Sequence, residues 1–276
     1  MTDHETVLRS ALATYREAVE PVTTEGVAGL LLTGSLPTGF VDEHSDVDLT
    51  LLFSGDRAAG TREDLGDRLV PEGATVQRAD AGEKYSFDWR GTHFDLFCAS
   101  LPALRDRELT PETRWEYDTA EVLADPTGRV ETFLEEALAL PRSERAALVG
   151  DHSERFHWTA QWDVHKWCVR DRPLSAHHLL SSVLGDLLAL CYLRDGEFVP
   201  REKWLVRLLE TLPSTDAATT RRVAAATRVD ELDTADVRRR VRAAKCLWDD
   251  LLADLDTAGL VDAAGLAWEN DEILRE

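Results

Sequence analysis

The sequence predicts an α+β fold in which a small mixed-sheet domain, residues 1–140, is followed by an all-helical domain, residues 141–276. Two observations predict it. Short apolar runs bounded by turn residues, the pattern of strands, occur mainly in the first half of the chain, whereas apolar residues recur at helical spacing through the second half. No low-complexity linker separates the halves, so we expect a packed interface at the boundary near residues 140–150.

The first half begins with a helix and continues with strands and turns. Apolar residues at helical spacing predict a helix over residues 5–20, which Pro21 ends. A second helix is expected over residues 57–69, and Arg90-Gly91 is expected to form a two-residue turn between two strands. The expected strands are short and apolar or β-branched; they cover residues 27–33, 47–53, 74–80, 84–89 and 92–100.

The second half shows helical periodicity almost throughout, apart from a short segment around "EVLADPTG" that precedes it. Turn signals at "DRP", "DGE" and "LPS" separate the periodic stretches. The expected helices cover residues 130–140, 143–170, 175–193, 200–212, 216–227, 234–255 and 262 to the end.

The chain is strongly acidic, with 52 Asp and Glu against 31 Lys and Arg and a formal net charge of -21. The acidic residues are spread along the chain and only four basic residues are lysine, a composition typical of proteins from high-salt cytoplasm, where salt screens repulsion between like charges. The arginine run 238–240 is interpreted as a solvated helix face. Because binding along a nucleic acid requires a basic track, we expect no extended nucleic acid as partner.

Neither a membrane anchor nor a disulfide framework is expected. No uninterrupted apolar run approaches the roughly 20 residues that a membrane span needs, and no apolar N-terminal stretch follows a basic segment. We therefore expect a cytoplasmic protein that has no membrane partner. The four cysteines form no Cys-x-x-Cys pair and are interpreted as small core residues; they are Cys98, Cys168, Cys191 and Cys246.

The segment "GSLPTGFVDEHSDVDLTLLF", residues 34–53, places two acids at the start of an apolar strand. Side chains alternate along a strand, so Asp46 and Asp48 share one face. They would lie about 6.7 Å apart and repel by about 2.5 kcal/mol at an effective dielectric of 20, so we expect a positive charge between them. Upstream, Gly34 permits close approach of a ligand to the backbone, and Ser35 offers a hydroxyl and an amide hydrogen.

A third acid, Asp95, lies within the apolar strand "THFDLFCAS", between Phe94 and Leu96. If this strand neighbours the first, three carboxylates converge, and oxygen ligands of this kind select hard cations such as Mg²⁺ or Mn²⁺. Asp88, next to Trp89, remains the alternative third carboxylate.

The order of these residues resembles the polymerase-β-type nucleotidyltransferase superfamily, whose signature is Gly-Ser, a spacer, Asp-x-Asp and a later strand acid. The matching positions are Gly34, Ser35, Asp46, Asp48 and Asp95.

Within the superfamily the chain is similar to the small-molecule branch, which includes the aminoglycoside and lincosamide nucleotidyltransferases. Residues 187–213 resemble the part of their helical domain in which a Gly-containing turn leads to a lysine at a helix start, and Lys203 is the match. The resemblance covers residues 25–100 through specific motifs and residues 120–215 through a looser pattern.

The resemblance implies transfer of a nucleoside monophosphate from a nucleoside triphosphate, with ATP the one we expect, to a hydroxyl of a small molecule, with release of pyrophosphate. In the family the first two acids bridge two metal ions, which implies that role for Asp46 and Asp48, and Asp95 would hold the second ion. Gly34, Ser35 and Lys203 would bind the triphosphate. The sequence predicts neither the identity of the acceptor nor the oligomeric state.

Two other functions stay open. A non-catalytic or regulatory protein, like the antitoxin-type minimal nucleotidyltransferases, would act through protein contacts, and it has no need of three convergent carboxylates. Addition of nucleotides to an RNA or protein acceptor is the other; for RNA it is disfavoured by the acidity of the chain. For Lys203 a packing role stays open as the alternative to nucleotide binding, because its aliphatic stem could simply cover Trp204.

Overall fold

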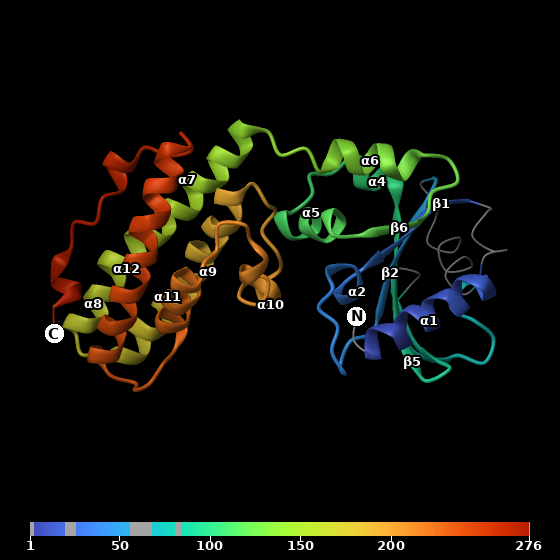
Figure 1. Ribbon diagram of the computed structural model, residues 1–276, viewed down its shortest axis with the longest axis horizontal. Coiled ribbons are helices and arrows are strands. Elements are labelled where there is room, and N and C mark those ends of the chain that lie inside the picture. Colours follow the sequence, from blue (N-terminus) through green and yellow to red (C-terminus); the bar gives the residue numbers. More distant parts are fainter. Residues whose placement is uncertain (1–2, 20–25, 56–67, 81–83, 276) are drawn as a thin grey trace. The chain divides into compact units, whose positions relative to one another are not determined.

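The computed structural model describes residues 3–19, 26–55, 68–80 and 84–275, which divide into two compact units (Figure 1). The first, Met1–Ala139, is called the sheet unit here, and the second, Leu140–Glu276, the helical unit. The predicted fold class, a small mixed sheet followed by helices, is confirmed. The predicted helix over residues 57–69 falls almost wholly outside the described residues.

The sheet unit contains a six-stranded sheet with the strand order β3-β4-β5-β2-β1-β6. The strands are β1 (Val27–Thr33), β2 (Val47–Phe53), β3 (Thr75–Asp80), β4 (Lys84–Trp89), β5 (Thr92–Ser100) and β6 (Glu121–Ala124). The central strands β2 and β5 pair in parallel, whereas all the other neighbours are antiparallel. The predicted turn between β4 and β5 is confirmed, since Arg90 and Gly91 both have positive φ, 51° and 81°.

One face of the sheet is covered by α1 (Asp3–Val19) (Figure 1). Apolar residues at helical spacing, among them Leu8, Leu12 and Tyr15, form the buried side of this helix. They belong to one apolar core with alternate residues of the central strands, such as Leu49 of β2 and Phe94 of β5. This face is therefore closed by hydrophobic packing.

The opposite face is covered only in part. Three helices that follow β5 and flank β6, namely α4 (Leu101–Arg105), α5 (Pro111–Asp118) and α6 (Arg129–Ala137), form a second core with Leu31 of β1 and Leu52 of β2. The helices α4 and α5 were not predicted from the sequence; both are short and have a Pro in the first turn. The acidic end of β2 lies outside this second core, so the polar side chains there keep access to solvent.

The helical unit is built from helices that match most of the predicted ranges. They are α7 (Arg142–Trp158), α8 (Val164–Val169), α9 (Pro173–Asp195), α10 (Glu202–Leu205), α11 (Ala217–Thr227) and α12 (Thr234–Thr257). The predicted helix 143–170 is continuous but contains a π-helical turn at Thr159–Asp163. The predicted helix 200–212 is broken into α10 and a 3-10 turn at Leu209–Thr211.

The prediction of a helix from residue 262 to the end is wrong. That segment forms two 3-10 turns, Ala263–Leu266 and Asp271–Leu274. Between the two turns the backbone bonds to a distant side chain: the Gln161 carbonyl oxygen Oε1 accepts the amide hydrogens of Glu269 and Asn270, at 2.7 and 3.0 Å. This long-range contact, between residues 108 and 109 positions apart, outweighs the local helical periodicity.

Helix α9 is long and apolar enough to cross a membrane by length and composition, with a mean hydropathy of 1.3 over its most apolar window. Of that window 56% is buried inside the structure, where α9 packs against α7, α8 and α12. Such burial is typical of a core helix in a globular unit, because the apolar side chains already pack against protein neighbours.

Tyr15 of α1 provides a test of the packing on the closed face. Its side chain is fully buried, its ring stacks on Phe94 at 5.0 Å between centroids, and its hydroxyl donates to the Leu69 carbonyl at 2.9 Å. Tyr15→Ala is expected to lower the free energy of unfolding by about 3–5 kcal/mol because it opens a cavity, and Tyr15→Phe by only about 1 kcal/mol because it removes one hydrogen bond. Urea unfolding of the full chain measures both, and equal losses would contradict this account.

Candidate functional site

The parallel pairing of β2 with β5 places Asp48 directly opposite Asp95. Residues paired in this way point to the same face of a sheet, and here it is the face that α4, α5 and α6 leave partly open. On the other side of β2, Thr33 of β1 pairs with Asp48. The open end of this face therefore carries polar side chains from three adjacent strands.

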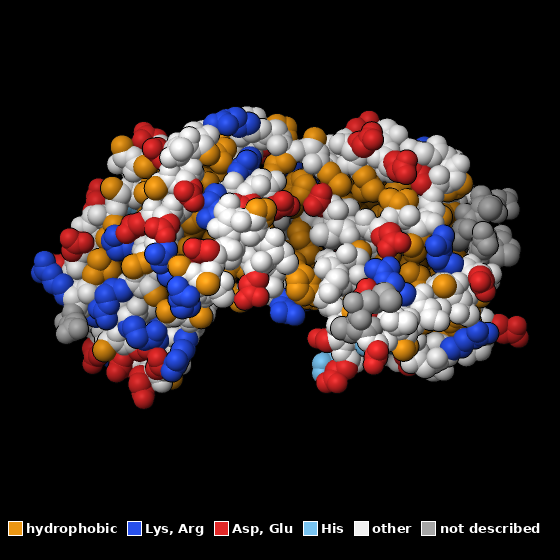
Figure 2. All heavy atoms as spheres, viewed as in Figure 1, with side chains coloured by type: hydrophobic (Ala, Val, Ile, Leu, Met, Phe, Trp, Pro, Cys, Tyr) orange, Lys and Arg blue, Asp and Glu red, His pale blue; other side chains and the backbone are white. Residues whose placement is uncertain are grey.

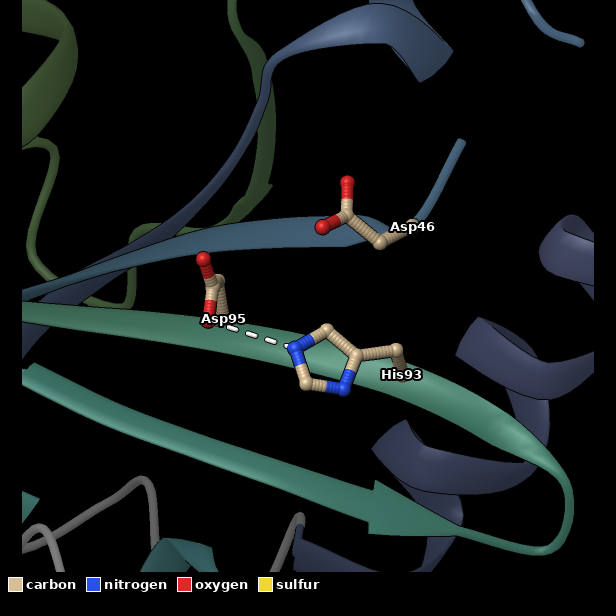
Figure 3. A group of neighbouring side chains, drawn as sticks. All are labelled: Asp46, His93 and Asp95. Carbon is tan, nitrogen blue, oxygen red and sulfur yellow. Dashed lines mark ion pairs between the residues drawn. The ribbon is translucent and has the colours of Figure 1, made fainter. Parts of the chain in front are cut away.

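Asp46, just before β2, completes a compact group with two side chains of β5. Each of Asp46, His93 and Asp95 offers one ligand atom, a carboxylate oxygen or an imidazole nitrogen. These three atoms lie within 4.8 Å of one another, a spacing that could hold a metal ion. Figure 3 shows the imidazole of His93 and the two carboxylates on the same side of the strands. All three residues are half-buried. His93 was not predicted as a site residue, although its position two residues before Asp95 on one strand puts both side chains on one face.

A positive charge lies beside Asp95. The ammonium of Lys84, on the neighbouring strand β4, donates to Asp95 Oδ2 at 2.7 Å and lies 4.6 Å from the centre of the Phe97 ring. Burial raises the pKa of Asp95, but the hydrogen bonds from Lys84 and Ser86, and the charges of Lys84 and His93, more than offset it, so the pKa lies below its ordinary value. Asp95 is therefore held as the charged carboxylate.

Lys84 was not predicted as a site residue: the positive charge was expected between Asp46 and Asp48, whereas the ammonium of Lys84 contacts Asp95. Two signals could have identified it. The chain has only four lysines, and in "KYSFDW" the alternation places Lys84, Ser86 and Asp88 on one face of β4.

Asp88, the alternative third carboxylate, has a different environment. Its Oδ1 lies 2.7 Å from His93 Nδ1, and its Oδ2 accepts from the Gln77 amide. The pKa of Asp88 lies below its ordinary value. The hydrogen bond from His93 is the largest cause, and the hydrogen bond from Gln77 is the second. Within the described residues, the group that could hold a metal includes Asp95 and does not include Asp88.

The Gly-Ser turn lies against Asp48. Gly34 has φ +75°, and a Cβ atom added there would come within 2.0 Å of Asp48 Oδ2, so only glycine allows the turn to approach the carboxylate this closely. After Gly34 the chain continues into a one-turn helix that begins at Ser35, α2 (Ser35–Thr38). Among the described residues no hydrogen-bond partner meets the buried hydroxyls of Ser35 and Thr33.

Lys203 belongs to α10 of the helical unit. Its side chain is exposed, and its ammonium lies 5.3 Å from the centre of the Trp204 ring, as the packing alternative expects. The sheet unit thus brings Gly34, Asp46, Asp48 and Asp95 together, whereas binding of triphosphate by Lys203 stays a prediction.

Comparison with known proteins gives a family model and solved structures. The model of a domain of unknown function (DUF4037) matches residues 109–205, which include Lys203 and exclude the aspartates of the site. No curated protein matches the sequence.

The similar structures include a nucleotidyltransferase-like protein from Exiguobacterium sibiricum, with 13% sequence identity, a TM-score of 0.44, and coverage of 89% of this chain and 76% of that chain. Another is the spectinomycin adenyltransferase AAD(9) from Enterococcus faecialis, solved with ATP and spectinomycin; it has 13% identity, a TM-score of 0.35, and coverage of 88% of this chain and 98% of that chain. The chain is similar to nucleotidyltransferase-like proteins, as its motif predicts.

Proposed function

We propose that the protein transfers a nucleoside monophosphate, with AMP the one expected, from a nucleoside triphosphate to a hydroxyl group of a small molecule. One observation carries the proposal: Asp46, Asp48 and Asp95 share the open end of one sheet face, and the Gly34-Ser35 turn lies directly against Asp48. A site that only binds another protein has no need of three convergent carboxylates beside such a turn.

The residues present fit divalent metal ions. Carboxylate oxygens are the ligands that Mg²⁺ and Mn²⁺ prefer, and within the described residues Asp95 Oδ1 is a buried oxygen without a hydrogen-bond partner. Asp46, Asp48 and Asp95 would hold the metal. When bound, such ions polarise phosphoryl oxygens and lower the pKa of a hydroxyl that attacks phosphorus.

The residues of the chain itself would orient the two reactants. The backbone at Gly34 permits close approach of a phosphate group, and the buried Ser35 hydroxyl, which has no partner among the described residues, can donate to a phosphate oxygen. Lys203 would add a positive charge for the triphosphate. These groups would bind charge that moves onto the leaving pyrophosphate.

A small acceptor fits the distribution of charge better than a long nucleic acid. Basic side chains gather over part of the helical unit on the face in Figure 2, with acidic side chains close by. The helical unit contains basic side chains that are paired within the chain: Arg222 with Asp250, Arg228 with Asp230, and Lys245 with Asp249. Paired cations contribute less to phosphate binding than free ones, because the carboxylate must first be displaced.

Asp48→Asn tests the catalytic proposal. The substitution removes the charge of a proposed metal ligand with almost no change in volume, so we expect transfer of labelled nucleotide in Mg²⁺ to fall by at least about 100-fold while the fold is kept. The matched control is Glu43→Gln, an exposed carboxylate in the same loop, which should leave the rate unchanged. A folded Asp48→Asn variant with the wild-type rate would remove the catalytic assignment.

Gly34→Ala, compared with Gly39→Ala, tests the contact of the turn with Asp48. Both glycines have φ +75°, but Gly39 has ψ 10° and lies in the left-handed helical region, whereas Gly34 has ψ -142°, which disfavours other residues more strongly, so Gly34→Ala should lose more stability. A Cβ atom at residue 39 meets no atom within 4 Å, whereas one at residue 34 displaces the Asp48 carboxylate. Only Gly34→Ala should lose the increase in melting temperature that Mg²⁺ and ATP give together; an equal loss in the two variants would speak against the contact.

Lys203→Met tests the proposed contact with triphosphate. Methionine keeps an apolar chain over Trp204 and removes the charge, so the apparent KM for the triphosphate should rise by about tenfold while stability stays unchanged. Steady-state kinetics at fixed acceptor concentration measures this. An unchanged KM would mean that Lys203 only packs against Trp204 and does not bind the triphosphate.

A further inference from the structure

We propose that His93 is itself a ligand of the divalent cation, oriented by Asp88, and that this nitrogen donor makes the site prefer a first-row transition ion such as Mn²⁺ over Mg²⁺. The inference deepens the proposed function and rests on it, because the ion would lie beside Asp46 and Asp95. The resemblance to nucleotidyltransferases assigns the metal to carboxylates only.

The orientation of the imidazole is set by Asp88. A carboxylate can only accept a hydrogen bond, so the 2.7 Å contact between His93 Nδ1 and Asp88 Oδ1 requires the proton on Nδ1. In the neutral ring the lone pair is then on Nε2, which lies 3.0 Å from the Ser86 hydroxyl and 3.6 Å from Asp95 Oδ1. Ser86 has a single proton, so when it donates to Asp95 the lone pair of Nε2 is left for a cation. A carboxylate behind a histidine is the usual support of metal-bound imidazole.

His93 lies beside the carboxylates of Asp46 and Asp95, whose oxygens can bind a cation. The ligand atoms of Asp46, His93 and Asp95 lie within 4.8 Å of one another, and Figure 3 shows that the ring and both carboxylates lie together over the two strands. Lys84 occupies Asp95 Oδ2, whereas Oδ1 is buried and meets no hydrogen-bond donor among the described residues. An oxygen left in this state costs free energy unless a cation or water satisfies it.

The mixed donor set determines the preference among cations. Mg²⁺ favours oxygen ligands in near-ideal octahedral geometry and keeps several waters, so an imidazole nitrogen adds little to its binding. First-row transition ions bind nitrogen more strongly, and their affinity for such a site rises from Mn²⁺ through the series. The nitrogen of His93 should therefore raise affinity for Mn²⁺ more than for Mg²⁺.

Titration of the full chain with Mn²⁺ alone, followed by electron paramagnetic resonance, tests the inference, with Mg²⁺ as competitor. The wild type should bind Mn²⁺ at least about tenfold more tightly than Mg²⁺. His93→Ala should lose about tenfold or more in Mn²⁺ affinity and much less in Mg²⁺ affinity, and Asp88→Ala should show a smaller change in the same direction. His178→Ala, at an exposed histidine of α9, is the matched control and should behave as the wild type.

A spectroscopic signature separates ligation from a structural role. Electron spin echo modulation of bound Mn²⁺ should show coupling to an imidazole ¹⁴N nucleus, and His93→Ala should abolish it. If Mn²⁺ binds to the wild type without ¹⁴N coupling and His93→Ala keeps the same ratio of affinities, His93 is only an ion-pair partner and the inference fails, while the carboxylate site survives. If the wild type binds neither ion, with or without ATP, the proposed function fails as well.

Discussion

In the parallel pairing of β2 with β5, Asp48 lies opposite Asp95, and the same register places Leu52 opposite Ala99. This pairing brings the acids of β2 and β5 together; the β1–β2 pairing then adds the Gly34-Ser35 turn, and the β4–β5 pairing adds Lys84. A shift of one residue in the register would turn the Asp95 side chain to the face covered by α1, where the neighbours are apolar and an unpaired carboxylate is costly. Burial of alternate residues on that face therefore also fixes the site.

Charge balance is the second constraint on the site. Carboxylates from two adjacent strands repel one another, and partial burial strengthens the repulsion. Lys84 offsets one charge through its contact with Asp95, and the remaining negative charge is what a divalent cation would neutralise. Lys84 and a cation act on different oxygens of the same carboxylate, so the lysine can keep Asp95 in place while the other oxygen stays available.

Sequence alone predicted the elements whose pattern is local. The strands at residues 27–33 and 47–53 match β1 and β2 to the residue, because apolar alternation and flanking turns specify them. The pairing of the distant strands β2 and β5 was expected only conditionally. Lys84 and His93 lie 11 and 2 positions before Asp95 in the sequence, and neither was predicted as a site residue, because that role depends on which side chains the folded sheet brings next to Asp95. Pattern gives the face of each residue, whereas tertiary structure decides which faces meet.

Arg240, in the helical unit, is a second residue whose environment the sequence pattern did not predict. Residues 238–240 were interpreted as a solvated helix face, and that is wrong for Arg240, which is only 1% exposed. Its guanidinium donates to the Ala226 carbonyl at 2.8 Å and to His177 Nδ1 at 2.8 Å, so the ring of His177 accepts at that nitrogen. In both units, then, a histidine has one nitrogen committed by a charged neighbour. In the helical unit that neighbour is a donor and takes up a lone pair; at the candidate site it is Asp88, an acceptor, so the lone pair of His93 is left on the side of the carboxylates.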